Sequence, residues 1–212
     1  MKYDVVLFDL DGTLTESGIG ITRSVAYALR KHGIEETDQK KLDRFVGPPL
    51  IDSFMRFYGF TAEQARQAVD DYREYYAVKG IFENRVYDGV IPMLEGLKAA
   101  GVRCILATSK PEGYAVQIME HFGLMPWFDR VAGATMDEKR TQKVDVIAYA
   151  LEGIPADSRV LMVGDREHDI LGAKANGLDS VGVLYGYGSR EELEAAGATY
   201  IAAAAEEVLK FI

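Results

Sequence analysis

Short apolar runs recur along the chain, and each ends at polar residues. The clearest is Val5–Phe8, which is apolar at every position and is followed directly by Asp9. A strand that is apolar on both faces is typical of a parallel sheet covered by helices on both sides. Similar runs predict further strands at Val102–Ala107, Arg130–Ala134, Val160–Val163 and Ser180–Leu184.

Helical patterns lie between these runs, and several end at a glycine. The pattern over Val90–Ala100 ends at Gly101, and that over Glu112–Phe122 ends at Gly123, the residue type that helix C-termini favour. The alternation of strands and helices predicts an α/β fold with a doubly wound parallel sheet. Further helices are predicted over Gln142–Leu151 and His168–Asn176, and a terminal helix is predicted to contain the Ala-rich segment Ala202–Ala205.

The region from residue 16 to residue 85 departs from this alternation. It contains no run typical of a buried strand, and its apolar residues have helical spacing, as Ile21, Val25 and Leu29 show. About 70 residues are too many for one crossover connection between strands. We therefore predict an α-helical cap domain at residues 16–85, inserted into an α/β core domain formed by residues 1–15 and 86–212.

Composition and charge narrow the classes of protein to consider. The chain has 212 residues, with 24 Lys and Arg against 33 Asp and Glu, a net charge of −9. An acidic protein repels a polyanion, so we expect no nucleic-acid partner. No apolar stretch is long enough for a membrane helix, and the N-terminal apolar run is interrupted by acidic residues, unlike a signal peptide. The single cysteine, Cys104, suits a reducing cytoplasm. The oligomeric state stays open.

Polar residues gather where the predicted strands end. Ligands of open α/β sheets bind beyond the carboxyl ends of the strands, so these residues are candidates for a site. Thr108 and Ser109, taken alone, are interpreted as caps of the following helix, and each aspartate as a turn residue. Considered together, the polar residues at the ends of these strands predict one site that combines carboxylate, hydroxyl and ammonium groups. The candidates are Asp9, Asp11, Thr108, Ser109, Lys110, Lys143, Asp165 and Asp169.

Four motifs in this set resemble those of the haloacid dehalogenase superfamily of phosphatases. The segment Asp9-Leu10-Asp11-Gly12-Thr13 resembles the first motif, and Gly164-Asp165-Arg166-Glu167-His168-Asp169 resembles the fourth. Thr108 matches the second motif. Lys143 matches the third but lacks the usual Lys-Pro context, so Lys139 and Arg140 stay open as alternatives. The helical insert is similar to the first cap class of the superfamily. The phosphoglycolate phosphatase-like branch is the most similar, through Phe45–Leu50 and Gly186–Leu193.

The resemblance implies a Mg²⁺-dependent phosphatase acting on a small soluble phosphate ester. Asp9 would attack phosphorus and form an aspartyl-phosphate, and Asp11 would donate a proton to the leaving alcohol. The magnesium ligands would be Asp9, the backbone carbonyl of Asp11, and Asp165, all oxygen donors of the kind Mg²⁺ prefers. Asp169 would either bind the metal or orient its ligands.

The remaining candidates contact the substrate on the same model. Thr108 and Lys143 would hold the phosphoryl oxygens, together with backbone N–H groups around Ser109 at the start of the next helix. In the cap, Arg44 is a candidate contact for a carboxylate or phosphate group of the substrate. Phosphoglycolate, a nucleoside monophosphate and a sugar phosphate all stay open as substrates.

Other activities share parts of this pattern. A sugar-phosphate mutase would return the phosphoryl group to a second hydroxyl of the substrate. A phosphonate hydrolase would need a lysine of the cap to form a Schiff base, and the candidates are Lys31, Lys40, Lys41 and Lys79. A signalling module phosphorylated on aspartate also combines acidic residues, a hydroxyl and a lysine at the end of a parallel sheet. Asp11 and the helical insert favour the phosphatase, because a slow phosphorylation switch needs neither an acid–base group nor a lid.

Overall fold

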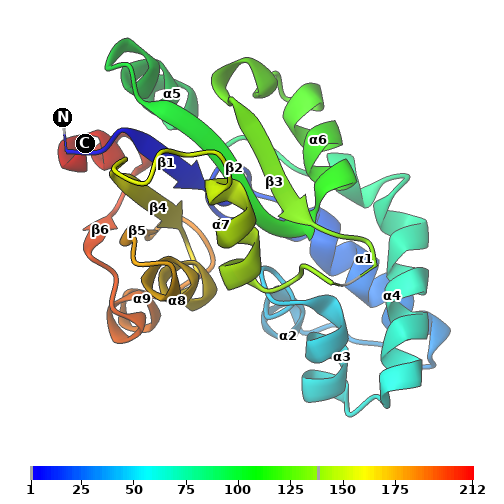
Figure 1. Ribbon diagram of the computed structural model, residues 1–212. Coiled ribbons are helices and arrows are strands. Elements are labelled where there is room, and N and C mark those ends of the chain that lie inside the picture. Colours follow the sequence, from blue (N-terminus) through cyan, green and yellow to red (C-terminus); the bar gives the residue numbers. More distant parts are fainter. Residues whose placement is uncertain (1, 138) are drawn as a thin grey trace. The chain divides into compact units, whose positions relative to one another are not determined.

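The structure is a computed structural model that describes residues 2–137 and 139–212 (Figure 1). The chain divides into two compact units, which are described separately below. One unit combines Met1–Thr15 with Val86–Ile212, and the other is Glu16–Arg85. We call them the α/β unit and the helical unit. No helix within the described residues has both the length and the apolar character needed to cross a membrane.

The α/β unit is built on one parallel sheet, with strand order β3-β2-β1-β4-β5-β6 among the described residues. The order reverses at β1, which has β2 on one side and β4 on the other. Ligands of doubly wound sheets bind at such a reversal. The strands are β1 (Val5–Phe8), β2 (Arg103–Pro111), β3 (Arg130–Ala134), β4 (Val160–Gly164), β5 (Asp179–Val183) and β6 (Tyr200–Ala202).

Helices pack on both faces of this sheet because the connections change direction at β1. Right-handed crossovers from β1 through β2 to β3 place α5 and α6 on one face, and the return through β4 to β5 places α7 and α8 on the other (Figure 1). Alternate strand residues such as Val5 and Leu7 pack with Val146 and Ile147 of α7. The helices are α5 (Val90–Ala99), α6 (Glu112–His121), η2 (Met125–Trp127), α7 (Lys143–Leu151), α8 (Glu167–Ala175), α9 (Arg190–Ala196) and η3 (Ala205–Phe211).

The helical unit contains no strand among its described residues. Its long helices α1 and α4 pack together, and α3 packs on α4. The start of α4 is a capping box, in which Thr61 Oγ1 accepts the N–H of Gln64 and Gln64 Oε1 accepts the N–H of Thr61. Its elements are α1 (Gly18–Lys31), α2 (Gln39–Asp43), α3 (Leu50–Tyr58), α4 (Ala62–Tyr76) and η1 (Gly80–Phe82).

The predicted doubly wound α/β fold is confirmed, but the prediction for the C-terminal segment is wrong. Ala202 ends the strand β6, and a 3₁₀ helix begins only at Ala205. The strand β6 has three residues, too few to give the apolar run that marks the other strands. Its backbone pairs with β5, from Val181↔Tyr200 to Val183↔Ala202, and this tertiary pairing outweighs the helix propensity of the alanines.

Candidate active site

The turn after β1 carries two buried aspartates. Asp9 follows the strand directly, and its backbone N–H donates to the carbonyl of Val163 in β4 at 3.0 Å. Asp9 and Asp11 are 6% and 9% exposed. Gly12 has a φ of +81°, and a side chain there would collide with the carboxyl group of Asp165. A glycine therefore allows the turn to approach the end of β4 closely.

The end of β4 carries two more buried aspartates. Asp165 follows the strand and accepts a hydrogen bond from the Thr13 hydroxyl at 3.4 Å. Asp169 lies in the first turn of α8, and its Oδ2 accepts the backbone N–H of Arg166 at 3.1 Å. A side chain at Gly164 would collide with Asp169, so a glycine is needed where the strand passes this carboxylate.

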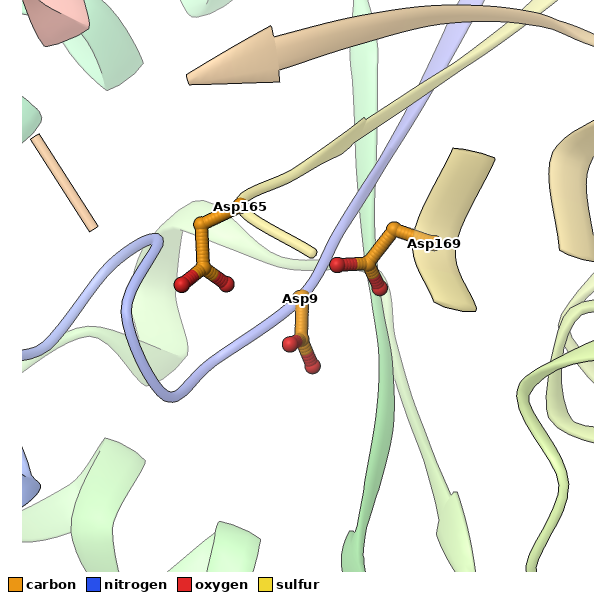
Figure 2. Close-up of side chains that lie close together, drawn as sticks. All are labelled: Asp9, Asp165 and Asp169. Atoms are coloured by element: carbon orange, nitrogen blue, oxygen red, sulfur yellow. The ribbon is translucent and has the colours of Figure 1, made fainter. Parts of the chain in front are cut away.

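Three of these carboxyl groups form one cluster. Figure 2 shows Asp9, at the end of β1, between Asp165 and Asp169. Each offers an oxygen, and these oxygens lie within 4.8 Å of one another. Burial, followed by the charges of Asp169 and Asp9, raises the pKa of Asp165 well above its ordinary value. Burial is also the main reason that the pKa of Asp169 is raised. The cluster therefore holds more negative charge than its surroundings compensate.

Lys143 joins two members of this cluster. It is the first residue of α7, and its Nζ lies 2.7 Å from Asp9 Oδ1 and 2.7 Å from Asp169 Oδ1. The ammonium group also donates to the carbonyl of Ala107 at 3.1 Å. Burial alone would lower the pKa of Lys143, but the charges of Asp169 and Asp9 outweigh it and raise that pKa. Lys143 is therefore held as a cation inside the site.

The two alternatives to Lys143 have other partners. Lys139 Nζ is exposed and pairs with Asp137 at 3.0 Å. Arg140 donates from its Nε to the carbonyl of Gly133 at 2.9 Å, and its guanidinium stacks on the ring of Tyr149. The structure brings Lys143, rather than either of these, to the acidic cluster.

The end of β2 differs from the prediction. The strand continues through Thr108 and Ser109 to Pro111, and α6 begins only at Glu112. The expectation that Thr108 and Ser109 cap this helix, or that the N–H groups around Ser109 lie at its start, is wrong. The pairing of β2 with β3 shifts register between Thr108 and Pro111 and resumes at Pro111↔Ala134, so the strand includes the residues after Thr108. Thr108 is buried at the end of β2, and its Oγ1 accepts the backbone N–H of Lys110 at 3.2 Å.

Lys110, to which the motifs assign no role, is the second buried lysine. Its Nζ lies 2.9 Å from Asp11 Oδ2, and its side chain is only 6% exposed. The signal in the sequence is its spacing, because residues two apart on a strand point to the same face and Lys110 follows Thr108 by two. That signal is usable only if the strand is known to continue past Thr108.

A loop after β5 packs against both acidic turns. The backbone N–H of Tyr187 donates to Asp165 Oδ2 at 2.8 Å, and the Tyr185 hydroxyl donates to the carbonyl of Thr13 at 3.0 Å. Side chains at Gly186 and Gly188 would collide with the backbone of Gly12 and Asp165 respectively. The loop therefore holds the ends of β1 and β4 together, a role that the sequence resemblance around Gly186–Leu193 does not reveal.

Arg44, the predicted substrate contact, lies in the helical unit directly after α2. Its guanidinium carbon is 3.8 Å from the centre of the Phe57 ring, a cation–π arrangement. Phe57 thus holds the Arg44 side chain within its own unit.

The acidic side chains fit a divalent cation. Within the described residues of this site, four carboxylates (Asp9, Asp11, Asp165 and Asp169) face two lysines, Lys110 and Lys143. The carboxyl groups thus outnumber the lysines that contact them, and Asp11 Oδ1 is buried without a hydrogen-bond partner in the part of the chain that the structure describes. All the candidate ligands are oxygens, which hard cations such as Mg²⁺ prefer over softer metals.

The family model described as haloacid dehalogenase-like hydrolase matches residues 6–183. The chain therefore belongs to the haloacid dehalogenase-like hydrolase family. The match extends from β1 to β5 and includes every acidic and lysine residue of the site.

Curated relatives of this chain carry different names. A 5'-nucleotidase of Pseudomonas aeruginosa is 46% identical over 96% of this chain and 92% of its own length. The tyrosine-protein kinase PtkA of Mycobacterium tuberculosis is 42% identical over 95% of this chain and 69% of its own length. A phosphoglycolate phosphatase of Rhodospirillum rubrum is 35% identical over 91% of this chain and 84% of its own length.

A solved structure is also similar to this chain over its whole length. A predicted phosphatase from Clostridium acetobutylicum superposes with a TM-score of 0.95 at 50% identity, covering 100% of this chain and 98% of the other. The family and these relatives establish the chain as a phosphoric monoester hydrolase of the haloacid dehalogenase-like family.

Proposed function

We propose that this enzyme hydrolyses a small soluble phosphate monoester, with Mg²⁺, through an aspartyl-phosphate formed on Asp9. The observation that carries the proposal is the contact of Asp9 with Lys143 inside a cluster of carboxylates that offers three oxygens to one cation. The proposed location is the cytoplasm, on the ground of the single cysteine.

In the proposed mechanism, Asp9 is the nucleophile. Its carboxylate attacks phosphorus, and the attack opposes like charges because a phosphate monoester is a dianion. Lys143 reduces that repulsion, since its ammonium group lies 2.7 Å from Asp9 Oδ1 in a site with little water to screen the charges. Lys143 and Thr108 would also hold the phosphoryl oxygens, with N–H groups near Ser109 donating from the end of β2 rather than from a helix.

Asp11 is the proposed acid and base. Its Oδ2 contacts Lys110, whereas its Oδ1 is buried without a hydrogen-bond partner among the described residues. That free oxygen would carry the proton that passes to the leaving alcohol. The resulting carboxylate would then take a proton from the water that hydrolyses the aspartyl-phosphate.

Asp9, Asp165 and the backbone carbonyl of Asp11 would hold the magnesium ion, with Asp169 either binding it or orienting the other ligands. When bound, the ion supplies positive charge that stabilises the negative charge developing on the phosphoryl oxygens. Asp165 is oriented for this role by the hydrogen bonds from Tyr187 N–H and the Thr13 hydroxyl.

We further propose that the helical unit Glu16–Arg85 is the cap domain and that Arg44 contributes to substrate specificity. The name of the relative at 46% identity makes a nucleoside 5'-monophosphate the first substrate to test, and the name of the relative at 35% identity makes phosphoglycolate the second.

The test is phosphate release by chelator-treated protein with and without MgCl₂. The substrates are p-nitrophenyl phosphate, nucleoside 5'-monophosphates, phosphoglycolate and hexose phosphates. We expect turnover that depends on Mg²⁺ and one metabolite class with a much higher kcat/KM. Full activity in the presence of excess chelator would contradict the proposed metal dependence.

The covalent intermediate has its own test. Protein mixed with a ³²P-labelled substrate and quenched in acid within milliseconds should carry the label on the peptide that contains Asp9. The matched control is Asp9→Asn, which has nearly the same shape but is not a carboxylate. Label on another peptide would contradict the assignment of Asp9.

Transfer of the phosphoryl group to an acceptor other than water is the second candidate, because a relative at 42% identity is named a tyrosine-protein kinase. Incubation with [γ-³²P]ATP and separation of phosphate from phosphotyrosine distinguishes the two. Incubation with a hexose phosphate tests for a mutase, which would produce an isomerised sugar phosphate. A signalling module would instead show a stable label on Asp9 without turnover. In a phosphonate hydrolase, borohydride would reduce and trap the Schiff base between the substrate and a cap lysine.

A further inference from the structure

We propose that Lys110 is a positioning residue that orients Asp11 for proton transfer to the leaving alcohol. The proposal rests on the function proposed above, in which Asp11 is the acid and base. It goes beyond that function because it gives a role to a lysine to which the resemblance assigns none.

The contact between Lys110 and Asp11 is buried on both sides. Lys110 Nζ lies 2.9 Å from Asp11 Oδ2, and the exposed fractions of the two side chains are 6% and 11%. Burial of an ammonium group is unfavourable unless a partner compensates it. The position of Lys110 therefore depends on Asp11, and that of Asp11 on Lys110.

The contact distinguishes the two oxygens of Asp11. Oδ2 faces the ammonium group, whereas Oδ1 is buried and lacks a hydrogen-bond partner among the described residues. A carboxyl group held at one oxygen presents the other in a constant direction. Oδ1 is thus the oxygen that can carry the transferred proton, and Lys110 determines where it points.

The two lysines also divide the acids between them. Lys143 contacts Asp9 and Asp169, and Lys110 contacts Asp11. Among the described residues, Lys110 is the cation that pairs with Asp11, so its loss would leave the carboxyl group of Asp11 without that contact. We infer that the division keeps the proton donor apart from the nucleophile.

The local structure of β2 fixes the backbone of Lys110. Its N–H donates to Thr108 Oγ1 at 3.2 Å, and the strand extends to Pro111 through the register shift against β3. The next residue, Glu112, accepts the N–H of Gly133 at 3.2 Å. Lys110 is therefore presented by a segment anchored on both sides, as a positioning residue requires.

The proton and electron balance is that of the proposed hydrolysis. In the first half, Asp9 forms a bond to phosphorus, the bond from phosphorus to the ester oxygen breaks, and the proton on Asp11 Oδ1 moves to that oxygen. In the second half, Asp11 takes a proton from water as the hydroxyl attacks phosphorus and releases Asp9. Lys110 keeps its protons throughout.

The experiment compares two leaving groups in Lys110→Met. An alkyl phosphate, such as the best metabolite from the panel above, needs a proton on its leaving oxygen, whereas p-nitrophenolate leaves without one. The measured quantity is kcat/KM, which includes the steps up to departure of the alcohol. We expect a loss of about 100-fold on the alkyl ester, the size expected for a misplaced catalytic group, and less than about 5-fold on p-nitrophenyl phosphate.

Three variants make the result specific. Asp11→Asn should show the same selectivity with a larger loss, because it removes the proton donor itself. Lys110→Arg keeps the charge and should recover most of the activity on the alkyl ester. Lys174→Met, which replaces an exposed lysine of α8 in the same unit, should leave both reactions unchanged. Melting followed by circular dichroism checks the folding of each, and Lys110→Gln replaces Lys110→Met if the latter does not fold.

Each outcome has a definite meaning. Equal losses on both esters in Lys110→Met, with a selective loss in Asp11→Asn, would overturn the positioning role and leave the proposed function intact. Failure of Asp11→Asn to discriminate between the leaving groups would overturn the acid–base role on which the inference rests. Selective loss in both, with recovery in Lys110→Arg, supports the proposal.

Discussion

The two units of this protein each bury aspartate in a different way. In the helical unit, Asp71 is 4% exposed and pairs with Lys31 at 2.7 Å and with His32 at 3.1 Å. Burial alone would raise the pKa of Asp71, but its hydrogen bonds with Lys31 and His32 outweigh burial and lower that pKa. In the α/β unit, burial and neighbouring acids raise the pKa of Asp165.

The difference separates a structural acid from a functional one. A buried carboxylate whose partners compensate its charge contributes to stability. Carboxylates that outnumber the nearby cations reduce the stability of the metal-free protein, and such a cluster persists where a ligand or a reaction uses it. The comparison predicts opposite consequences for substitutions in the two places.

The largest expected effect is that of Asp9→Asn on catalysis. The amide has nearly the shape of the carboxylate but cannot form an aspartyl-phosphate, so kcat should fall by about 10⁴-fold or more. The measurement is phosphate release at saturating substrate and Mg²⁺, with an unchanged circular dichroism spectrum as the control. More than a tenth of the original rate would contradict the assignment of the nucleophile.

Next in size is the effect of replacing the lysine of the third motif. Lys143→Met removes the cation that contacts Asp9 and Asp169, and kcat should fall by about 10²- to 10³-fold, as for the loss of one charge-stabilising group. Lys139→Met is the matched control, because Lys139 pairs with Asp137 at the surface, and its kcat should change less than about twofold. A large loss in the control instead would assign the motif to Lys139.

In the helical unit the expected effect is on stability rather than on chemistry. Asp71→Ala removes the partner of Lys31 and His32 and should lower the free energy of unfolding by about 2 kcal/mol at neutral pH. The lowered pKa of Asp71 contributes stability above the ordinary aspartate pKa, and that stability is lost as the pH falls through the lowered value. Urea unfolding at pH 7 and near pH 3 should therefore show the difference between variant and parent shrinking in acid. A constant difference would contradict the electrostatic origin.

The smallest expected effect is that of Asp165→Asn on the free energy of unfolding. We expect this substitution to stabilise the protein, whereas Asp71→Ala should destabilise it. Because the pKa of Asp165 is raised, its ionised form opposes folding at neutral pH, and this destabilisation develops as the pH rises from the ordinary aspartate pKa. Removal of the charge should stabilise the chelator-treated protein by about 1 kcal/mol.

The control for Asp165→Asn is the response to metal. A cation that binds only the folded protein raises its stability, so MgCl₂ should raise the melting temperature of the parent and raise that of Asp165→Asn much less. A chelator-treated variant that is less stable than its parent would break the comparison between the two units.

The sequence was sufficient where a single segment determined the outcome. Val5–Phe8 is apolar on both faces, so its place in the covered sheet followed from the pattern alone. The convergence of Asp9 and Asp165 followed from the rule for strand ends. The pairing of Lys110 with Asp11 did not, because it requires β2 to continue past Thr108, and the register shift against β3 is a tertiary feature. The strand β6 was not predicted for the same reason, since pairing with β5 alone makes it a strand.

The central position of β1 has a consequence for co-translational folding. Val5 pairs with Arg103 on one side and with Val160 on the other, so both partners of β1 are synthesised about 100 residues or more after it. Formation of these strand pairs is slow, because the chain loses conformational entropy in closing the long loops before the contacts between strands compensate it. A nascent chain that stops before residue 160 would have an incomplete sheet and lack two of the four carboxylates. If Asp165 and Asp169 have the roles proposed above, we expect no activity before both have been translated.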